Sequence, residues 1–198
     1  IEGRKDLERL TRLPILADIP VAKGLDKKKD ERAVVVRENF NDVIEEAFRG
    51  LRTNIGFVLK PGEKVIMTTS CIPGEGKTFV AANLAMSLAL LGKRVIVVGL
   101  DIRKPRLVAL FGLKPTKLGI VNFLCGSEPD YELLESQIIP SGIHKNMDVL
   151  PAGIIPPNPA ELLSGSMLKD AIKYLSSKYD YVLLDTPPVG LVSDTLTI

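Results

Sequence analysis

The chain has 198 residues, enough for one sizeable domain or two small ones. A hydrophobic content of 45% excludes a disordered protein, and a formal net charge of +2 gives no electrostatic support for a protein that coats nucleic acid. The longest apolar stretch, residues 79–91, is too short to cross a bilayer, and two cysteines cannot build a disulfide framework, so we expect a soluble domain from a reducing compartment.

The first forty residues carry only short elements. Ile1–Arg4 is either a natural start or a match to a protease-cleavage tetrapeptide. Leu13–Ile19 predicts a short strand, and Ala33–Val36 predicts a second one. We therefore expect residues 1–40 to be a lead-in segment and residues 41–198 to form one α/β domain that is truncated at its C-terminal end.

A long amphipathic helix is predicted next. Asp42 and Glu45 have the spacing of a capping box at its start, and Pro61-Gly62 ends the helical pattern. Its apolar residues recur at the helical period and define a wide core face: Val43, Ile44, Ala47, Phe48, Leu51, Ile55, Val58 and Leu59.

Three charged residues of this helix, Glu46, Arg49 and Arg52, recur every three positions away from the core face. One interpretation is a solvated helix face with a local Glu46–Arg49 ion pair, which contributes little energy. The other is a surface that pairs head to tail with a neighbouring subunit and closes a ring.

From residue 65 onward, short apolar segments alternate with helical segments. Continuously apolar strands between helices are typical of a parallel sheet that is covered on both faces. The sequence therefore predicts an α/β fold of the P-loop NTPase type, a mostly parallel sheet with helices on both faces. The predicted strands are 65–69, 95–98, 148–151 and 181–184, and the predicted helices are 77–91 and 160–176.

The segment Thr69-Ser70-Cys71-Ile72-Pro73-Gly74-Glu75-Gly76-Lys77-Thr78 lies between a predicted strand and a predicted helix and has the residues of a phosphate-binding loop. Glycines let successive backbone N–H groups point inward, and the helix start adds the positive end of its dipole. Lys77 can bridge the β- and γ-phosphates, and Thr78 offers a hydroxyl to Mg²⁺.

One position departs from the usual loop pattern, because Cys71 stands where the first glycine is expected. The strand–loop–helix setting still favours a phosphate site over an ordinary glycine-rich turn. The predicted nucleotide-binding residues are Pro73, Gly74, Glu75, Gly76, Lys77, Thr78 and Phe79.

Two carboxylates follow predicted strands. Asp185 comes after Tyr181–Leu184, which is the Walker B arrangement, and Asp101 comes after the strand at 95–98. Open α/β sheets place ligands at these strand ends, and phosphoryl transfer needs a carboxylate for the metal or for a proton. Either residue alone is equally compatible with a common strand-to-loop carboxylate.

These motifs together resemble the Walker A, A′ and B motifs of bacterial tyrosine kinases, a family of the wider MinD/ParA-type P-loop group that controls capsular and exopolysaccharide export. Glu46–Arg52 resembles the family's Glu-x-x-Arg-x-x-Arg oligomerisation motif, and Pro156–Leu163 is also similar to these kinases. The resemblance covers the chain from about Leu7 to its end. Its three motifs are Thr69–Thr78, Asp101-Ile102-Arg103 and Leu184–Pro188.

The resemblance implies an ATP- and Mg²⁺-dependent protein-tyrosine autokinase that acts in trans within a ring of like subunits. It implies catalytic roles for Lys77, Asp101 and Asp185, with Thr78 and the two aspartates at the metal. The aspartates then orient metal-bound waters or take the tyrosine proton.

The family also implies a parent protein. In it, the domain lies at the cytoplasmic face of the bacterial inner membrane, and the same chain carries a membrane polysaccharide co-polymerase region. The implied partners are further copies of the chain, joined through the Glu46, Arg49 and Arg52 face, and nucleic acid is not among them.

The chain departs from the family pattern in three respects. Gly99 stands where the family's A′ motif has its first acidic residue, which is a candidate base or metal-shell group in the family. Asp101 or Asp185 would then have to take over more of that role. The chain ends at Ile198, soon after Walker B, and lacks the family's C-terminal tyrosine cluster. Its tyrosines do not resemble tail acceptors: Tyr131, Tyr174, Tyr179 and Tyr181.

Two other functions remain open at this point. One is a MinD/ParA-type ATPase, in which hydrolysis switches dimerisation and nothing is phosphorylated. The other is a nucleotide-gated assembly module without turnover, which Gly99 and the missing tail would suit.

Overall fold

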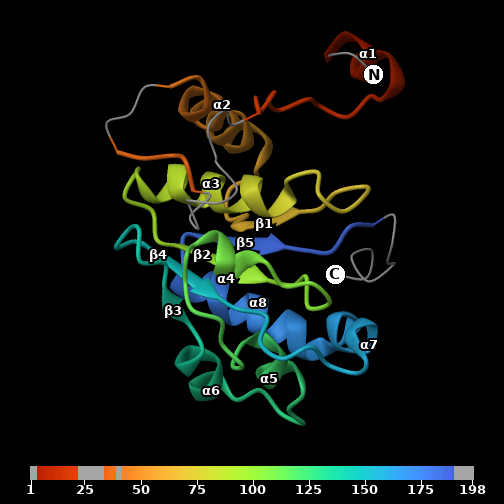
Figure 1. Ribbon diagram of the computed structural model, residues 1–198, viewed down its shortest axis with the longest axis vertical. Coiled ribbons are helices and arrows are strands. Elements are labelled where there is room, and N and C mark those ends of the chain that lie inside the picture. Colours follow the sequence, from red (N-terminus) through yellow and green to blue (C-terminus); the bar gives the residue numbers. More distant parts are fainter. Residues whose placement is uncertain (1–3, 22–33, 39–41, 190–198) are drawn as a thin grey trace.

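The computed structural model describes residues 4–21, 34–38 and 42–189. Helices and strands alternate around one five-stranded sheet (Figure 1). The helices are α1 (Arg4–Leu10), α2 (Val43–Val58), α3 (Lys77–Ala89), α4 (Leu107–Leu110), α5 (Ile120–Leu124), α6 (Tyr131–Ser136), α7 (Pro159–Ser164) and α8 (Ser166–Lys178). The strands are β1 (Val65–Thr68), β2 (Val95–Gly99), β3 (Ile139–Pro140), β4 (Met147–Leu150) and β5 (Tyr181–Asp185).

The strands of the sheet lie in the order β1-β5-β2-β4-β3. The first four are parallel, and β3 pairs antiparallel with β4 at the edge. The register places Thr68 of β1 and Gly99 of β2 on either side of Asp185 of β5, so the carboxyl ends of three strands meet. The expected α/β fold with a mostly parallel sheet is confirmed.

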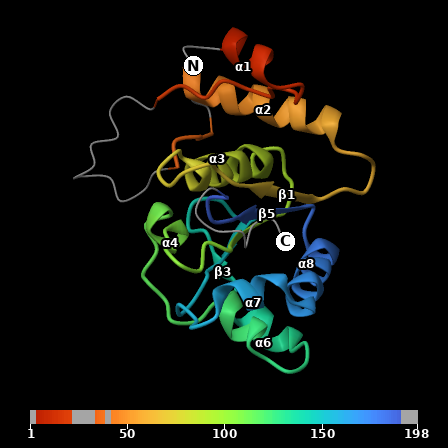
Figure 2. The ribbon, with the colours of Figure 1, turned by 90° about the vertical axis from the view of Figure 1, so that its right-hand side faces the viewer.

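Helices cover both faces of the sheet (Figures 1 and 2). α3 lies on one face with α2 packed outside it, and α5 to α8 lie on the other face. Strand β2 is buried throughout, and its side chains alternate between the two layers. Val95 and Val97 belong to the core beneath α3, whereas Ile96 and Val98 belong to the core beneath α8.

Helix α2 forms where the sequence predicts it, but Val43 and Val58, which were expected on its core face, are exposed. The Asp42 carboxylate accepts a hydrogen bond of 2.7 Å from the Glu45 N–H and caps the helix. Phe48, Leu51 and Ile55 are buried against α3, which is itself buried from Ala81 to Ala89 because it lies between α2 and the sheet. Among the described helices, none is long and apolar enough to cross a membrane.

Two predicted strands at the N-terminal side are wrong. Residues 13–19 form no strand, because this segment runs along α2 instead of a sheet edge, and Asn54 of α2 donates a hydrogen bond of 2.6 Å to the Leu16 carbonyl. Residues 34–36 form no strand either, because the N–H groups of Val35 and Val36 bind the Asn83 side chain of α3. Ala33 lies outside the described residues.

The predicted helix at 160–176 is also corrected. It is two helices, α7 and α8, separated at Gly165, whose backbone is extended with φ −76° and ψ 163°. Between α4 and β4, the short helices α5 and α6 and the strand β3 were not predicted.

Candidate nucleotide site

The phosphate-binding loop leaves the end of β1 and enters α3 at Lys77. Gly74 and Gly76 have φ angles of +89° and +93°, which side chains with a Cβ rarely adopt. The Glu75 carboxylate accepts hydrogen bonds from the N–H groups of Cys71 (2.8 Å) and Ile72 (3.0 Å) and so closes the outer part of the loop. The two glycines and Glu75 therefore give the loop its curved shape.

The loop is also tied to the segment that follows β5. The Thr69 hydroxyl donates to the Pro187 carbonyl at 3.0 Å, and the Val189 N–H donates to the Ser70 carbonyl at 2.9 Å. The Walker A and Walker B segments are thus held at a fixed distance from each other.

Four side chains converge at the start of α3. The Lys77 ammonium lies 2.8 Å from the Asp101 carboxylate and 3.9 Å from the Asp185 carboxylate. The Thr78 hydroxyl donates to the Asp185 carboxylate at 3.1 Å. The structure thus brings together the lysine, the hydroxyl and both carboxylates that the sequence pattern assigned to phosphate and metal.

Burial changes the acidity of this cluster. Asp185 is only 1% exposed, and its desolvation raises the pKa of the carboxyl to about 6. The positive charge of Lys77 and the Thr78 hydrogen bond lower that pKa, while the charge of Asp101 raises it. The Lys77 ammonium thus offsets part of the negative charge of both carboxylates.

The Thr78 hydroxyl and the Asp185 carboxylate are hard oxygen donors and fit Mg²⁺. Among the described residues, no group of three or more His, Cys, Asp or Glu side chains is placed to hold a metal ion. This donor set fits Mg²⁺ bound through one or two protein oxygens, with water and substrate phosphate completing the shell.

A cavity of about 770 Å³ opens beside this cluster. Its volume lies within the usual range for small-molecule sites. It is lined by Pro73, Gly74, Gly76, Lys77, Thr78, Asp101, Arg103, Lys104, Arg106, Ala109, Leu110, Pro187 and Pro188.

Two of the predicted nucleotide-binding residues do not line the cavity. The Glu75 carboxylate is engaged with the loop's own N–H groups, and the ring of Phe79 packs against Phe48 with centroids 5.9 Å apart. Sequence reasoning missed Ala109 and Leu110 in the lining, and it also missed Lys104 and Arg106. The only sequence signal for them was the basic run that follows Asp101.

Gly99 lies at a crowded point of β2. A Cβ at this position would lie 3.3 Å from the Ala152 backbone nitrogen and 3.4 Å from the Leu107 side chain. A side chain here would require neighbouring groups to move by a few tenths of an ångström. The close packing around Gly99 therefore leaves little room for a carboxylate side chain at this position of the A′ motif.

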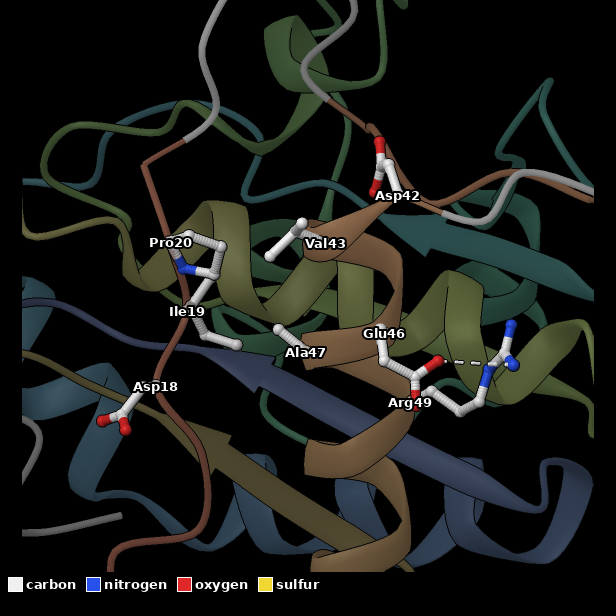
Figure 3. Close-up of a pocket in the computed structure, with 8 residues that line it drawn as sticks. All are labelled: Asp18, Ile19, Pro20, Asp42, Val43, Glu46, Ala47 and Arg49. Atoms are coloured by element: carbon white, nitrogen blue, oxygen red, sulfur yellow. Dashed lines mark ion pairs between the residues drawn. The ribbon is translucent and has the colours of Figure 1, made fainter.

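The charged residues of α2 divide into two groups. Glu46 and Arg49 are exposed and form an ion pair of 3.4 Å beside a hollow of about 820 Å³ between α2 and residues 18–20 (Figure 3). Arg52 turns inward, and its guanidinium donates to the Ser87 carbonyl (2.7 Å) and hydroxyl (3.1 Å) on α3. Glu46 and Arg49 thus pair with each other, whereas Arg52, which lines a smaller hollow together with Arg49, is linked to α3.

Comparisons with known proteins give consistent matches. A family model described as an AAA domain matches residues 63–196. The chain is 38% identical to the tyrosine-protein kinase YwqD of Bacillus subtilis over 83% of this chain and 67% of YwqD. It is 35% identical to the tyrosine-protein kinase wzc of Salmonella typhimurium over 91% of this chain, but it spans only 24% of that relative's length.

Solved structures agree. The kinase domain of the Escherichia coli tyrosine kinase ETK superimposes with a TM-score of 0.86 at 30% identity, covering 100% of this chain and 78% of that domain. The septum site-determining protein MinD of Pyrococcus horikoshii, complexed with Mg-ADP, gives a TM-score of 0.55 at 27% identity, covering 68% of this chain and 52% of MinD.

Proposed function

The chain belongs to the bacterial tyrosine-protein kinase family, and on this premise we propose that its site transfers the γ-phosphoryl group of ATP to tyrosine hydroxyls of proteins. One observation carries the proposal: Lys77, Thr78, Asp101 and Asp185 converge beside a preformed phosphate loop at the carboxyl ends of the strands.

The loop and Lys77 would bind the triphosphate. The backbone N–H groups from Gly74 to Thr78 and the N-terminal end of α3 favour an anion. Lys77 then leaves Asp101, from which it is 2.8 Å distant, and turns to the β- and γ-phosphates. Its charge stabilises the oxygens on which negative charge increases during transfer.

The two carboxylates would divide the remaining work. Thr78 and Asp185 hold Mg²⁺, which when bound offsets the charge of the phosphates. Asp101 would be released when Lys77 turns to the phosphates, and its carboxylate would then accept the proton of the tyrosine hydroxyl or a hydrogen bond from water at the metal site. With glycine at residue 99, β2 itself supplies no carboxylate for this second task.

We place this activity in capsular or exopolysaccharide synthesis. Relatives support the placement, since a tyrosine kinase of Klebsiella pneumoniae that is 36% identical over the whole chain is named for the cps region. The chain spans 28% of that relative, so the co-polymerase region and a position at the cytoplasmic face of the inner membrane are proposals about a longer parent protein.

We also propose that copies of the chain assemble and phosphorylate one another in trans. The exposed Glu46 and Arg49 would contact a neighbouring copy at the hollow of Figure 3. Arg52 would contribute from inside, by holding α2 against α3.

Replacing Lys77 with Met tests the catalytic proposal. We expect the formation of phosphotyrosine on a mixture of tyrosyl peptides to fall by about 100-fold or more, because the charge on the transferred group loses its main partner. Phosphotyrosine is measured by mass spectrometry after incubation with Mg²⁺-ATP.

Lys93→Met is the matched control, since Lys93 is exposed at the far end of α3 from the loop. It should keep the wild-type rate, and thermal unfolding should show that both variants are folded. Undiminished phosphotyrosine in a folded Lys77→Met protein would refute the assignment.

A further inference from the structure

The cavity beside the phosphate loop has a second wall that the nucleotide proposal does not use. This wall is the loop after β2, which bears Arg103, Lys104 and Arg106, followed by α4. Lys104 and Arg106 are exposed, and neither forms an ion pair or a side-chain hydrogen bond with the described residues. Two cations therefore face the cavity without a charged partner among residues 4–21, 34–38 and 42–189.

The lining carries more positive charge than the phosphate loop alone would supply. In the described part of the chain, the lining has four basic side chains and one carboxylate, Asp101, whereas the whole chain has a formal net charge of only +2. Of the four, only Lys77 belongs to the phosphate loop. A cavity with this concentration of one sign attracts a ligand of the opposite sign.

The basic loop is fixed close to the reacting groups. The Lys104 N–H donates to one oxygen of Asp101 at 3.2 Å, while Lys77 contacts the other oxygen at 2.8 Å. A molecule bound along the loop therefore lies next to Asp101, where a tyrosine hydroxyl must stand to receive the phosphoryl group.

Apolar groups complete this wall. Ala109 and Leu110 of α4 line the same cavity, together with Pro187 and Pro188 after β5. Aromatic side chains bury large apolar areas and keep their hydroxyl at a polar edge, so a tyrosine ring suits such a mixed surface.

We propose that this wall binds the phosphate acceptor, a segment of protein with acidic side chains next to its tyrosine. Lys104 and Arg106 pair with the flanking carboxylates, and Leu110 and the two prolines contact the ring. The tyrosine oxygen then forms a bond to the γ-phosphorus, the bond from that phosphorus to the β–γ bridging oxygen breaks, ADP leaves, and the phenolic proton passes to Asp101 or to water. This inference rests on the proposed kinase activity.

Two tyrosyl peptides that differ only in their flanking residues test the inference. One has Glu around the tyrosine and the other has Gln at the same positions. We expect the wild-type protein to give a kcat/KM about tenfold higher for the Glu peptide, and this preference should shrink as salt is added.

The double variant Lys104→Glu/Arg106→Glu should lose the preference, through a KM for the Glu peptide raised about tenfold or more, while the KM for ATP stays unchanged. The milder Lys104→Gln/Arg106→Gln should show the same direction if the first variant is unstable. Lys114→Glu/Lys117→Glu is the control, because it changes the charge equally on exposed lysines outside the cavity lining and should keep the preference.

The possible failures are distinguishable. Wild-type protein that phosphorylates neither peptide overturns the kinase proposal and this inference with it. Equal rates for the two peptides overturn the inference alone. A KM for ATP that rises in parallel with the KM for the peptide shows that Lys104 and Arg106 bind the nucleotide, which also overturns it.

Discussion

At the scale of single residues, Asp185 shows how a buried carboxylate of the candidate site weakens the fold that holds it. Its carboxyl is almost fully buried, and its pKa is raised to about 6 from 3.8. Because the folded state binds this proton more tightly than the unfolded state, ionisation of Asp185 costs stability at neutral pH. That cost is complete above the folded pKa and disappears as the pH falls toward 3.8.

We therefore expect Asp185→Asn to stabilise the protein without nucleotide or Mg²⁺ at pH 7.5. A shift of this size corresponds to about 3 kcal/mol at most, or several degrees in Tm. The gain should disappear near pH 4, and the variant should lose activity because Asn cannot replace the carboxylate at Mg²⁺.

Thermal unfolding at the two pH values checks this expectation. Asp170→Asn on α8 is a suitable control, and it should show no gain at pH 7.5. A lower Tm for Asp185→Asn at pH 7.5 would mean that the attraction of Lys77 outweighs the cost of burial.

At the scale of elements, the sequence indicates some features of the molecule better than others. The strands β1, β2 and β5 are mostly apolar, and their ends are predicted within one residue of those observed. Asp101 lies two residues beyond the end of β2. The helices α4, α5 and α6 have only four to six residues, too few to show a helical period, and so they escape prediction. The cavity wall that carries Lys104 and Arg106 was not predicted either, because it includes α4.

Arg52 illustrates a second limit, because its role depends on helix geometry. Three residues of an α-helix turn by about 300°, which is about 60° short of a full turn. Side chains spaced by three residues therefore point in directions that shift by about 60° at each step. Six residues after Glu46, Arg52 has turned by about 120° and meets Ser87 of α3. The sequence spacing suggested one shared contact surface, whereas in the structure Glu46 and Arg49 pair with each other and Arg52 is bonded to α3.

We expect two variants of α2 to separate these roles. Arg52→Ala should lower the free energy of unfolding by about 1–2 kcal/mol, because it removes charged hydrogen bonds to α3. Glu46→Lys should change it by less than about 1 kcal/mol, since Glu46 is exposed, but should weaken self-association.

Urea unfolding gives the stabilities, and analytical ultracentrifugation over a range of concentrations gives the association. The division of roles fails if Glu46→Lys associates as the wild type does, or if Arg52→Ala unfolds at the same urea concentration as the wild type.

At the scale of the whole molecule, the sheet register connects these parts. The carboxyl ends of β1, β5 and β2 bring the phosphate loop, Asp185 and the basic loop after Asp101 to one cavity. α3 starts at that cavity and carries, at Ser87, the contact to the helix that bears Glu46 and Arg49. The motifs predicted the loop and the carboxylates, but their distances and the second wall follow only from the fold.

The proposed kinase activity requires that the γ-phosphoryl group of ATP reaches tyrosine and not water. The most direct measurement incubates the protein with Mg²⁺-ATP and a tyrosyl peptide, and quantifies ADP, free phosphate and phosphotyrosine in the same sample. We expect phosphotyrosine to account for most of the ADP formed. ADP matched by free phosphate, with no phosphotyrosine, would contradict the account and identify an ATPase of the MinD type instead.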